Sequence, residues 1–264
     1  MTGTAAPDVL MGDNGPEPAP IDVSVDAGIA TVRMNAPKNR NALSARLVDA
    51  MLAALADVSA RDDVQAVVLG HTGSTFCSGA DLIEARDHGM AAGTQRMLTA
   101  SQAILDLPVP VIAKIDGHVR AGGMGIVAAC DIAVAGPKAS FAFTEVRLAL
   151  APAVLALTVF PRTSSRGASR YMLTGEVFDA AEAARIGLVT VAAEDTEREM
   201  VPMLDALRSC SALGLTETKR LTTAALRQDI AAHGAEAAAE SARHFASDEA
   251  KERMAAFLSR AASR

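Results

Sequence analysis

The sequence lacks the features that mark nucleic-acid-binding, secreted or membrane-spanning proteins. Its 264 residues carry 25 Lys and Arg against 31 Asp and Glu, a net charge of -6, so there is no basic excess for a nucleic-acid backbone. No apolar run approaches the roughly 20 residues that a bilayer requires. The first 20 residues have neither the basic region nor the apolar core of a signal peptide. We therefore expect a soluble, cytoplasmic protein without nucleic-acid or membrane partners.

Cysteine and histidine are too few and too scattered for a disulfide framework or a metal site. The three cysteines, Cys77, Cys130 and Cys210, lack metal-type spacing. No two histidines stand at i and i+4, the spacing of a helical metal site. The histidines are His71, His88, His118, His233 and His244. We expect no metal ion and a reducing compartment.

Length and composition favour one large core with a smaller appendage. Half of the residues are hydrophobic, which is enough for a core of this size. Residues 1–20 are rich in Pro, Gly and acids and are predicted to form a flexible tail. An α/β core is expected over residues 21–195. Residues 196–264 are predicted to be a helical C-terminal region that serves association.

Several segments of the core have clear periodicity. Residues 21–25 and 29–34 are short runs of β-forming residues on either side of a turn, and they predict a hairpin. Ser44 is a suitable N-cap for a helix with apolar residues at intervals of three or four. The continuous apolar runs at 64–69 and 109–115 predict strands that are buried on both faces.

Three glycines, Gly122, Gly123 and Gly125, lie after the second of these strands and begin a short predicted helix. Their G-x-G-x-x-A spacing matches a dinucleotide fingerprint, but the strand ends too early and the helix is too short. A second explanation is that unpaired N–H groups at the helix start bind a developing negative oxygen. The small-residue loop 76–82 also opens a helix and would supply a second donor. A third is that both clusters serve only tight turns and packing.

These two loops and four other segments resemble the enoyl-CoA hydratase/isomerase, or crotonase, superfamily, over residues 21–262. The segments are KNRNAL (38–43), FCSGADL (76–82), IDGHVRAGGMGIVAACDIAVA (115–135), TEVRLALAP (144–152), RYMLTGEVFDAAEAARIGLV (170–189) and SDEAKERMAAF (247–257). The resemblance implies an α/β fold, a crotonase-like spiral of ββα units with a helical C-terminal trimerisation region. It also implies assembly into a homotrimer or hexamer.

The resemblance further implies an acyl-CoA thioester as the ligand, with no cofactor besides the coenzyme A of the substrate. The thioester oxygen is expected to accept hydrogen bonds from the backbone N–H groups of Ala80 and Gly122. Lys38 and Arg40 are expected near the phosphates of the nucleotide, and Phe257 is expected to extend toward the coenzyme A of a neighbouring subunit. The remaining expected substrate contacts are Ala42, Ser78, Asp81, Leu82, Gly123 and Gly125.

Hydratases of this family typically use two glutamates, and only the second has a counterpart here. Glu145 matches it, whereas Gly125 stands at the place of the first. The apolar neighbours of Glu145 favour its protonated form and suit it to proton transfer. We expect an enoyl-CoA hydratase that adds water across the 2,3 double bond through an enolate held by the two donors. A 3,2-enoyl-CoA isomerase with one glutamate and a non-catalytic acyl-CoA-binding protein remain alternatives.

Three other polar residues near these loops are weaker catalytic candidates. Asp81 is placed to cap the helix that follows the loop. Glu84, one turn further on, is a weaker candidate to replace the absent glutamate. Ser78 lacks the strand-turn-helix elbow and the placed histidine of a serine nucleophile.

Overall fold

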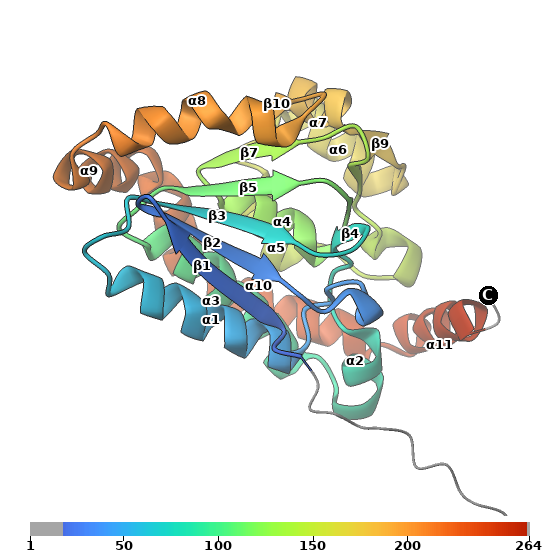
Figure 1. Cartoon of the computed structure of the whole chain (residues 1–264). Coiled ribbons are helices and arrows are strands. Elements are labelled where there is room, and N and C mark those ends of the chain that lie inside the picture. Colours follow the sequence, from blue (N-terminus) through green and yellow to red (C-terminus); the bar gives the residue numbers. More distant parts are fainter. Residues whose placement is uncertain (1–17, 263–264) are drawn as a thin grey trace, which may run out of the picture.

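The computed structural model describes residues 18–262, which form two sheets surrounded by helices (Figure 1). The larger sheet has the order β1-β2-β3-β5-β7-β10 and the smaller one β4-β6-β8-β9. The strands are β1 (Ile21–Asp26), β2 (Ile29–Met34), β3 (Ala66–His71), β4 (Thr75–Cys77), β5 (Val111–Ile115), β6 (His118–Arg120), β7 (Ile132–Ala135), β8 (Ser140–Ala142), β9 (Phe178–Asp179) and β10 (Val191–Ala192). The helices are η1 (Pro37–Asn39), α1 (Ala45–Ser59), α2 (Leu82–His88), α3 (Ala91–Asp106), α4 (Gly122–Ala129), η2 (Glu145–Leu148), α5 (Ala153–Val159), α6 (Ser165–Thr174), α7 (Ala180–Ile186), α8 (Thr196–Arg208), α9 (Ala212–Thr222), α10 (Ala224–Ala246) and α11 (Asp248–Ala262).

The larger sheet confirms the predicted hairpin and both predicted buried strands, with ends shifted by about two residues. Strands β1 and β2 are antiparallel, and Ala27 and Gly28 at their turn both have positive φ, as a type I′ turn requires. From β2 onward every neighbouring pair in this sheet is parallel. The predicted helix cap is also confirmed, since the Ser44 hydroxyl accepts a hydrogen bond from the Leu47 N–H at 3.3 Å.

Helices cover the larger sheet on both faces, which explains the unbroken apolar run in β3. Val67 and Leu69 point into the main core, which they share with apolar residues of α1 and α3. Ala66 and Val68 point to the other face, where Met200 of α8 packs against them. Successive residues of a strand face opposite sides, so a strand covered on both sides must be apolar throughout.

The predicted ββα spiral is confirmed, although two of its second strands, β4 and β6, were not predicted from the sequence. Strands β3, β5 and β7 each belong to the larger sheet and are followed by β4, β6 and β8 of the smaller one. Strands β4, β6 and β8 run parallel to one another. With three residues each, β4 and β6 have no measurable periodicity of their own. Strands β9 and β10 have two residues each, and neither was predicted from the sequence.

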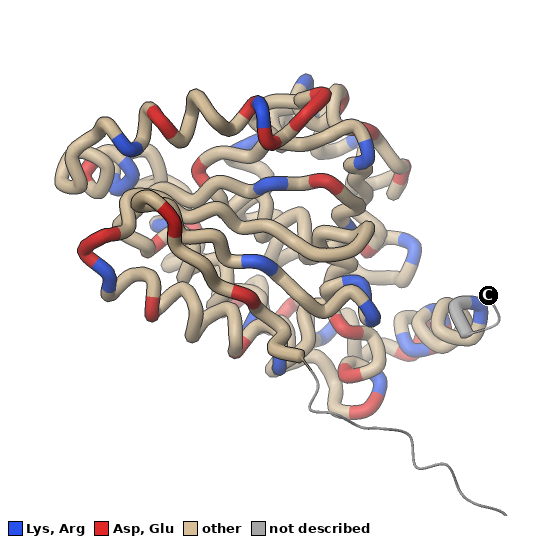
Figure 2. Tube along the Cα trace, in the orientation of Figure 1, with Lys and Arg blue, Asp and Glu red and all other residues tan. Residues whose placement is uncertain are grey.

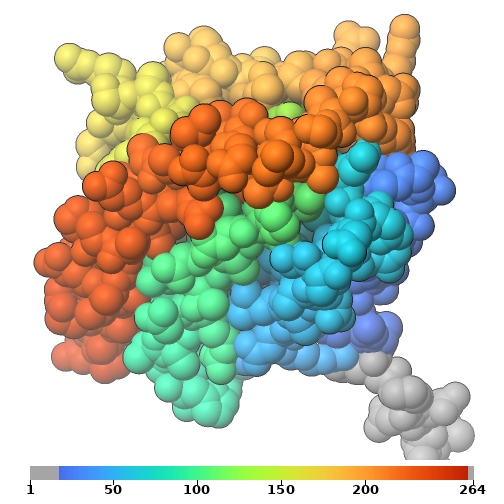
Figure 3. Space-filling view, turned by 90° about the vertical axis from the view of Figure 1, so that its left-hand side faces the viewer, coloured from blue at the N-terminus to red at the C-terminus, as the bar shows by residue number. Residues whose placement is uncertain are grey.

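The C-terminal helices lie against the middle of the chain. Helix α10 packs on α3 and α5, and the space-filling view shows the segment after about residue 210 directly against the segment near residue 105 (Figure 3). Basic and acidic residues are interspersed along the chain (Figure 2). Among the helices within residues 18–262, none combines the length and apolar character needed to cross a membrane. The division at residue 195 and the association of these helices stay predictions, and residues 1–17 of the predicted tail lie outside the described residues.

A buried ion pair attaches the start of the C-terminal helices to the sheet. The ammonium group of Lys219 in α9 lies 2.9 Å from Asp131 Oδ2, with the two side chains only 3% and 13% exposed. The same ammonium donates hydrogen bonds to the carbonyl oxygens of Ile104 and Val109, at 2.8 and 3.0 Å. Asp131 Oδ2 also accepts a hydrogen bond from the Val111 N–H at the start of β5. Lys219 therefore links α9, α3 and β5.

Replacing Lys219 by Met should lower the free energy of unfolding by about 3–5 kcal/mol, because Asp131 is left as a buried charge without its partner. Urea denaturation measures the change. The matched control is Arg220→Met, whose ion pair with Glu217 at 2.9 Å is more than half exposed on both sides. The control should lose less than about 1 kcal/mol. Equal losses in the two variants would contradict the assigned role of Lys219.

Candidate active site

The loops that follow β4 and β6 touch each other at the carboxyl ends of their strands. A Cβ atom on Gly79 would lie 2.7 Å from Ala121 Cβ, 3.1 Å from the Arg120 carbonyl oxygen and 3.3 Å from Gly122 N. Gly79 also has φ +91, which disfavours any other residue. The two loops therefore approach so closely only because this position has no side chain, and Ala80 and Gly122 become neighbours in space.

Both loops present backbone N–H groups without partners. Gly122 is the first residue of α4, where a helix leaves its N–H groups unbonded. Within residues 18–262 neither Ala80 N–H nor Gly122 N–H has a hydrogen bond outside regular secondary structure. Ala121, which directly precedes Gly122, has φ +47, a conformation that costs about 1–3 kcal/mol in a residue other than glycine. Its own N–H bonds to the Ala142 carbonyl at 3.1 Å, which holds this strained turn on β8.

Glu145 begins the η2 turn just after β8 and is 9% exposed. Its Oε2 atom is buried and has no hydrogen-bond partner among the described residues. Burial raises the pKa of this carboxyl to about 7, and a hydrogen bond from its own backbone N–H offsets only part of that effect. A carboxyl with this pKa exists in both protonation states near neutral pH, as a group that both takes and gives a proton requires.

Residues of the two loops and Glu145 line a cavity of about 870 Å³. Its wall brings together Ala80, Gly122 and Glu145, the three residues expected to be catalytic. Seven of the nine expected substrate-contacting residues also line it: Lys38, Arg40, Ala42, Ser78, Asp81, Leu82 and Phe257. Phe257 lies in α11 and, although it was expected to face a neighbouring subunit, it lines the cavity of its own chain.

Gly123 and Gly125, unlike the other expected substrate contacts, do not line the cavity and lie behind its wall. A Cβ atom on Gly123 would lie 2.8 Å from Cys77 Cβ, and one on Gly125 would lie 2.9 Å from Leu155 Cβ and 3.3 Å from Leu155 Cα. These glycines let α4 pack closely on β4 and α5. The space where a glutamate at position 125 would begin is occupied by α5.

The other acids near the cavity serve as helix caps. Asp81 Oδ1 accepts hydrogen bonds from the N–H groups of Ile83 and Glu84 at the start of α2, at 2.9 and 3.1 Å. The Glu84 carboxylate accepts the Ala45 N–H at the start of α1, at 3.0 and 3.1 Å. Glu84 does not line the cavity and does not replace the absent glutamate. Glu145 is therefore the one carboxyl in the described cavity wall that is not used as a cap.

Several residues that complete the wall could not be predicted from the sequence. Helix α3 contributes Met97 and Thr94, and α10 contributes Ser241 and Phe245. These residues are distant in sequence from the loops, and their helical pattern indicates only a packed face. Leu155 of α5 also lines the cavity, and no local signal distinguishes it from an ordinary core residue.

Comparisons with known proteins agree with this geometry. The family model described as enoyl-CoA hydratase/isomerase matches residues 24–263. A solved structure of an enoyl-CoA hydratase from Mycobacterium avium is 47% identical, with a TM-score of 0.87 over 92% of this chain and 98% of that one. The mitochondrial enoyl-CoA hydratase domain-containing protein 3 of Rattus norvegicus is 32% identical over 208 residues, which cover 75% of this chain and 68% of that protein.

Gly79→Ala should disrupt the contact between the two loops and weaken the binding of an acyl-CoA at least tenfold, measured by isothermal titration. The reason is the collision of the new Cβ with Ala121 and the Arg120 carbonyl. Gly89→Ala is the matched control, because Gly89 also has positive φ, +75, but open space around its Cβ position. The control should show only the backbone strain, about 1–3 kcal/mol in unfolding. Similar binding losses in both variants would show that strain, and not crowding, matters.

Glu145→Gln should stabilise the protein at high pH. In the wild type the carboxyl stays protonated up to about pH 7 when folded, whereas its ordinary pKa is 4.5. The native state thus binds more protons between these values and loses stability as pH rises through them, by about 3 kcal/mol in total. Urea denaturation at pH 4.5 and pH 8 should show an advantage of the Gln variant that grows with pH. An advantage independent of pH would contradict the raised pKa.

Proposed function

Because the chain belongs to the enoyl-CoA hydratase/isomerase family, we propose that it is an enoyl-CoA hydratase that uses Glu145 as its only acid and base. The observation that carries the proposal is the buried Glu145 carboxyl, without a partner on Oε2, in the same cavity as the free N–H groups of Ala80 and Gly122. The substrate is a 2-enoyl-CoA thioester, and no cofactor besides its coenzyme A takes part. Association into trimers or hexamers belongs to the same proposal.

The two N–H groups bind the thioester oxygen. As water adds to C3, the electrons of the double bond move toward this oxygen and an enolate forms. Preorganised donors bind the enolate oxygen more strongly than the carbonyl oxygen, and each supplies about 3 kcal/mol of stabilisation. Apolar residues of the cavity wall, such as Leu82, Met97 and Leu155, strengthen both interactions because they lower the local dielectric constant.

Glu145 moves the proton that the addition requires. Its ionised carboxylate takes one proton from the attacking water while the water oxygen bonds to C3. The protonated carboxyl then gives that proton to C2, and the thioester carbonyl reforms. The product carries a hydroxyl on C3 and a new hydrogen on C2, and Glu145 returns to its ionised state. One carboxyl thus completes the cycle when its pKa lies near neutrality.

Isomerisation of a 3-enoyl-CoA to a 2-enoyl-CoA is the second candidate, and the packing at Gly125 favours it. Leu155 occupies the space where a second acid would begin, so no other carboxyl in the described wall is available to hold a water. In this reaction Glu145 removes a proton from C2 and delivers it to C4, while the same two donors hold the enolate. No water is required.

The test offers the protein crotonyl-CoA and 3-hexenoyl-CoA in parallel. Hydration removes the absorbance of the conjugated thioester from crotonyl-CoA, and isomerisation creates it from 3-hexenoyl-CoA. Glu145→Gln should lower the observed rate by at least about a hundredfold while the affinity for the acyl-CoA stays within about twofold. Glu217→Gln on the exposed surface of α9 is the control and should retain full activity.

Each outcome of this experiment has one meaning. Gain of absorbance from 3-hexenoyl-CoA without loss from crotonyl-CoA replaces the hydratase by the isomerase. An active Glu145→Gln variant refutes both reactions. Binding of both thioesters without turnover by the wild type supports the non-catalytic alternative.

A further inference from the structure

Within residues 18–262, no side chain forms a hydrogen bond with the Glu145 carboxyl. Its hydrogen bond comes from its own backbone N–H, and Oε2 is buried without a partner in the described part of the chain. The position of the carboxyl is consequently determined by the backbone of η2. Whatever fixes this single turn also fixes the acid.

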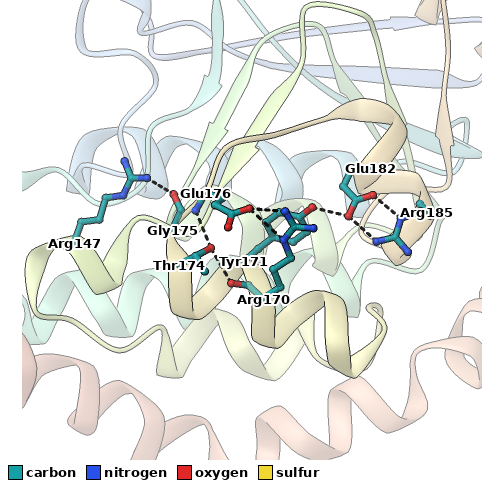
Figure 4. A network of polar contacts seen from close by, with 8 residues as sticks. All are labelled: Arg147, Arg170, Tyr171, Thr174, Gly175, Glu176, Glu182 and Arg185. Atoms are coloured by element: carbon teal, nitrogen blue, oxygen red, sulfur yellow. Dashed lines mark hydrogen bonds and ion pairs between the residues drawn. The ribbon is translucent and has the colours of Figure 1, made fainter.

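Arg147 connects η2 to the end of α6. Its Nη2 atom donates a hydrogen bond to the Gly175 carbonyl oxygen at 2.6 Å (Figure 4). Gly175 ends α6 with φ +63, a left-handed conformation that suits glycine. A Cβ atom there would lie 2.9 Å from Arg147 Nε, 3.3 Å from the Phe143 carbonyl oxygen and 3.4 Å from Val146 Cγ1. The residues on both sides of Glu145 therefore pack on a position that must lack a side chain.

Polar contacts brace the chain on both sides of Gly175 (Figure 4). The Thr174 hydroxyl donates to the Arg170 carbonyl at 2.9 Å and accepts the Glu176 N–H at 3.2 Å. The Glu176 carboxylate lies 2.8 Å from the Arg170 guanidinium. These contacts tie the turn to α6, so the Gly175 carbonyl is a fixed point for Arg147.

A second set of contacts extends the bracing to α7. Tyr171 of α6 donates a hydrogen bond from its hydroxyl to Glu182 Oε1 at 2.6 Å, and Glu182 also pairs with Arg185. The Arg170 guanidinium lies over the Tyr171 ring, 5.0 Å from its centre. Exposed ion pairs are individually weak, but several of them in one network restrict the same short segment.

We propose that Arg147 is a positioning residue for Glu145: by bonding to the Gly175 carbonyl it holds η2 against the braced end of α6, so that the carboxyl stays buried and directed into the cavity. The inference rests on the proposed role of Glu145 as acid and base. It assigns to the α6–β9 turn, which does not line the cavity, a part in the reaction.

The first measurement needs no turnover. Infrared difference spectra against pH, with the band of the protonated carboxyl assigned by its loss in Glu145→Gln, give the pKa of Glu145 in the resting protein. Arg147→Ala and Gly175→Ala should each move this pKa from about 7 toward its ordinary value, because η2 loosens and the carboxyl becomes hydrated. Arg147→Lys keeps a charged donor and should give an intermediate pKa. Arg166→Ala, which removes an exposed arginine of α6, is the control and should leave the pKa of Glu145 unchanged.

The second measurement is turnover of whichever thioester the wild type accepts. Arg147→Ala and Gly175→Ala should lower kcat by about tenfold to a hundredfold, and Arg147→Lys should recover part of the loss. Arg147 itself lines the cavity whereas Gly175 does not, so it is Gly175→Ala that should change KM by less than twofold. A wild-type pKa of Glu145 in the Arg147→Ala protein would overturn the proposal, whatever its activity. If the wild type turns over neither thioester, the proposed function fails while the infrared measurement still decides the role of Arg147. Should Arg147→Ala not fold, Arg147→Lys and Gly175→Ala decide it in the same way.

Discussion

The close contact of two backbone loops is the constraint on which the rest of the site depends. A side chain is excluded at Gly79, where Ala121 Cβ and the Arg120 carbonyl oxygen lie in the way. At Gly122 an added Cβ would lie 2.6 Å from Met97 Sδ, so that side chain would have to move. The small sheet is parallel through β4, β6 and β8, so the carboxyl ends of its strands lie in a row. Three separate parts of the chain thereby reach one cavity, as is usual at the carboxyl ends of parallel strands.

Desolvation acts on both halves of the site at once. Burial raises the pKa of Glu145, and the apolar wall around Gly122 lowers the dielectric constant in which the N–H donors act. A second carboxyl in this volume would raise one of the two pKa values further. The packing of α5 on Gly125 leaves no room for it. A single acid near neutral pKa and a firmly fixed turn are thus complementary features, since one carboxyl must serve two proton transfers from one position.

Much of the fold follows from periodicity in the sequence, and the parts that do not are those without it. The hairpin, the cap at Ser44 and the buried strands were predictable because each rests on a local preference. The short strands β4 and β6 were not, because their pairing is decided by the larger sheet that precedes them. In the site, Ala80, Gly122 and Glu145 were predictable from the resemblance. The meaning of Gly125 was not: it reflects the approach of α5 as well as the absence of an acid.

The C-terminal helices explain why the cavity depends on residues far from it. Helices α10 and α11 supply part of its wall, including Phe245 and Phe257. Helix α10 begins at Ala224, only a few residues after Lys219, whose ion pair with Asp131 is almost fully buried. Burying two charges is costly, and an apolar pair of similar volume often stabilises a protein as well or better. What an apolar pair lacks is direction: the ammonium group bonds to two named carbonyls as well as to Asp131, which fixes where α9 ends and α10 starts. The position of the cavity wall is therefore set in part by a charge pair that never touches the cavity.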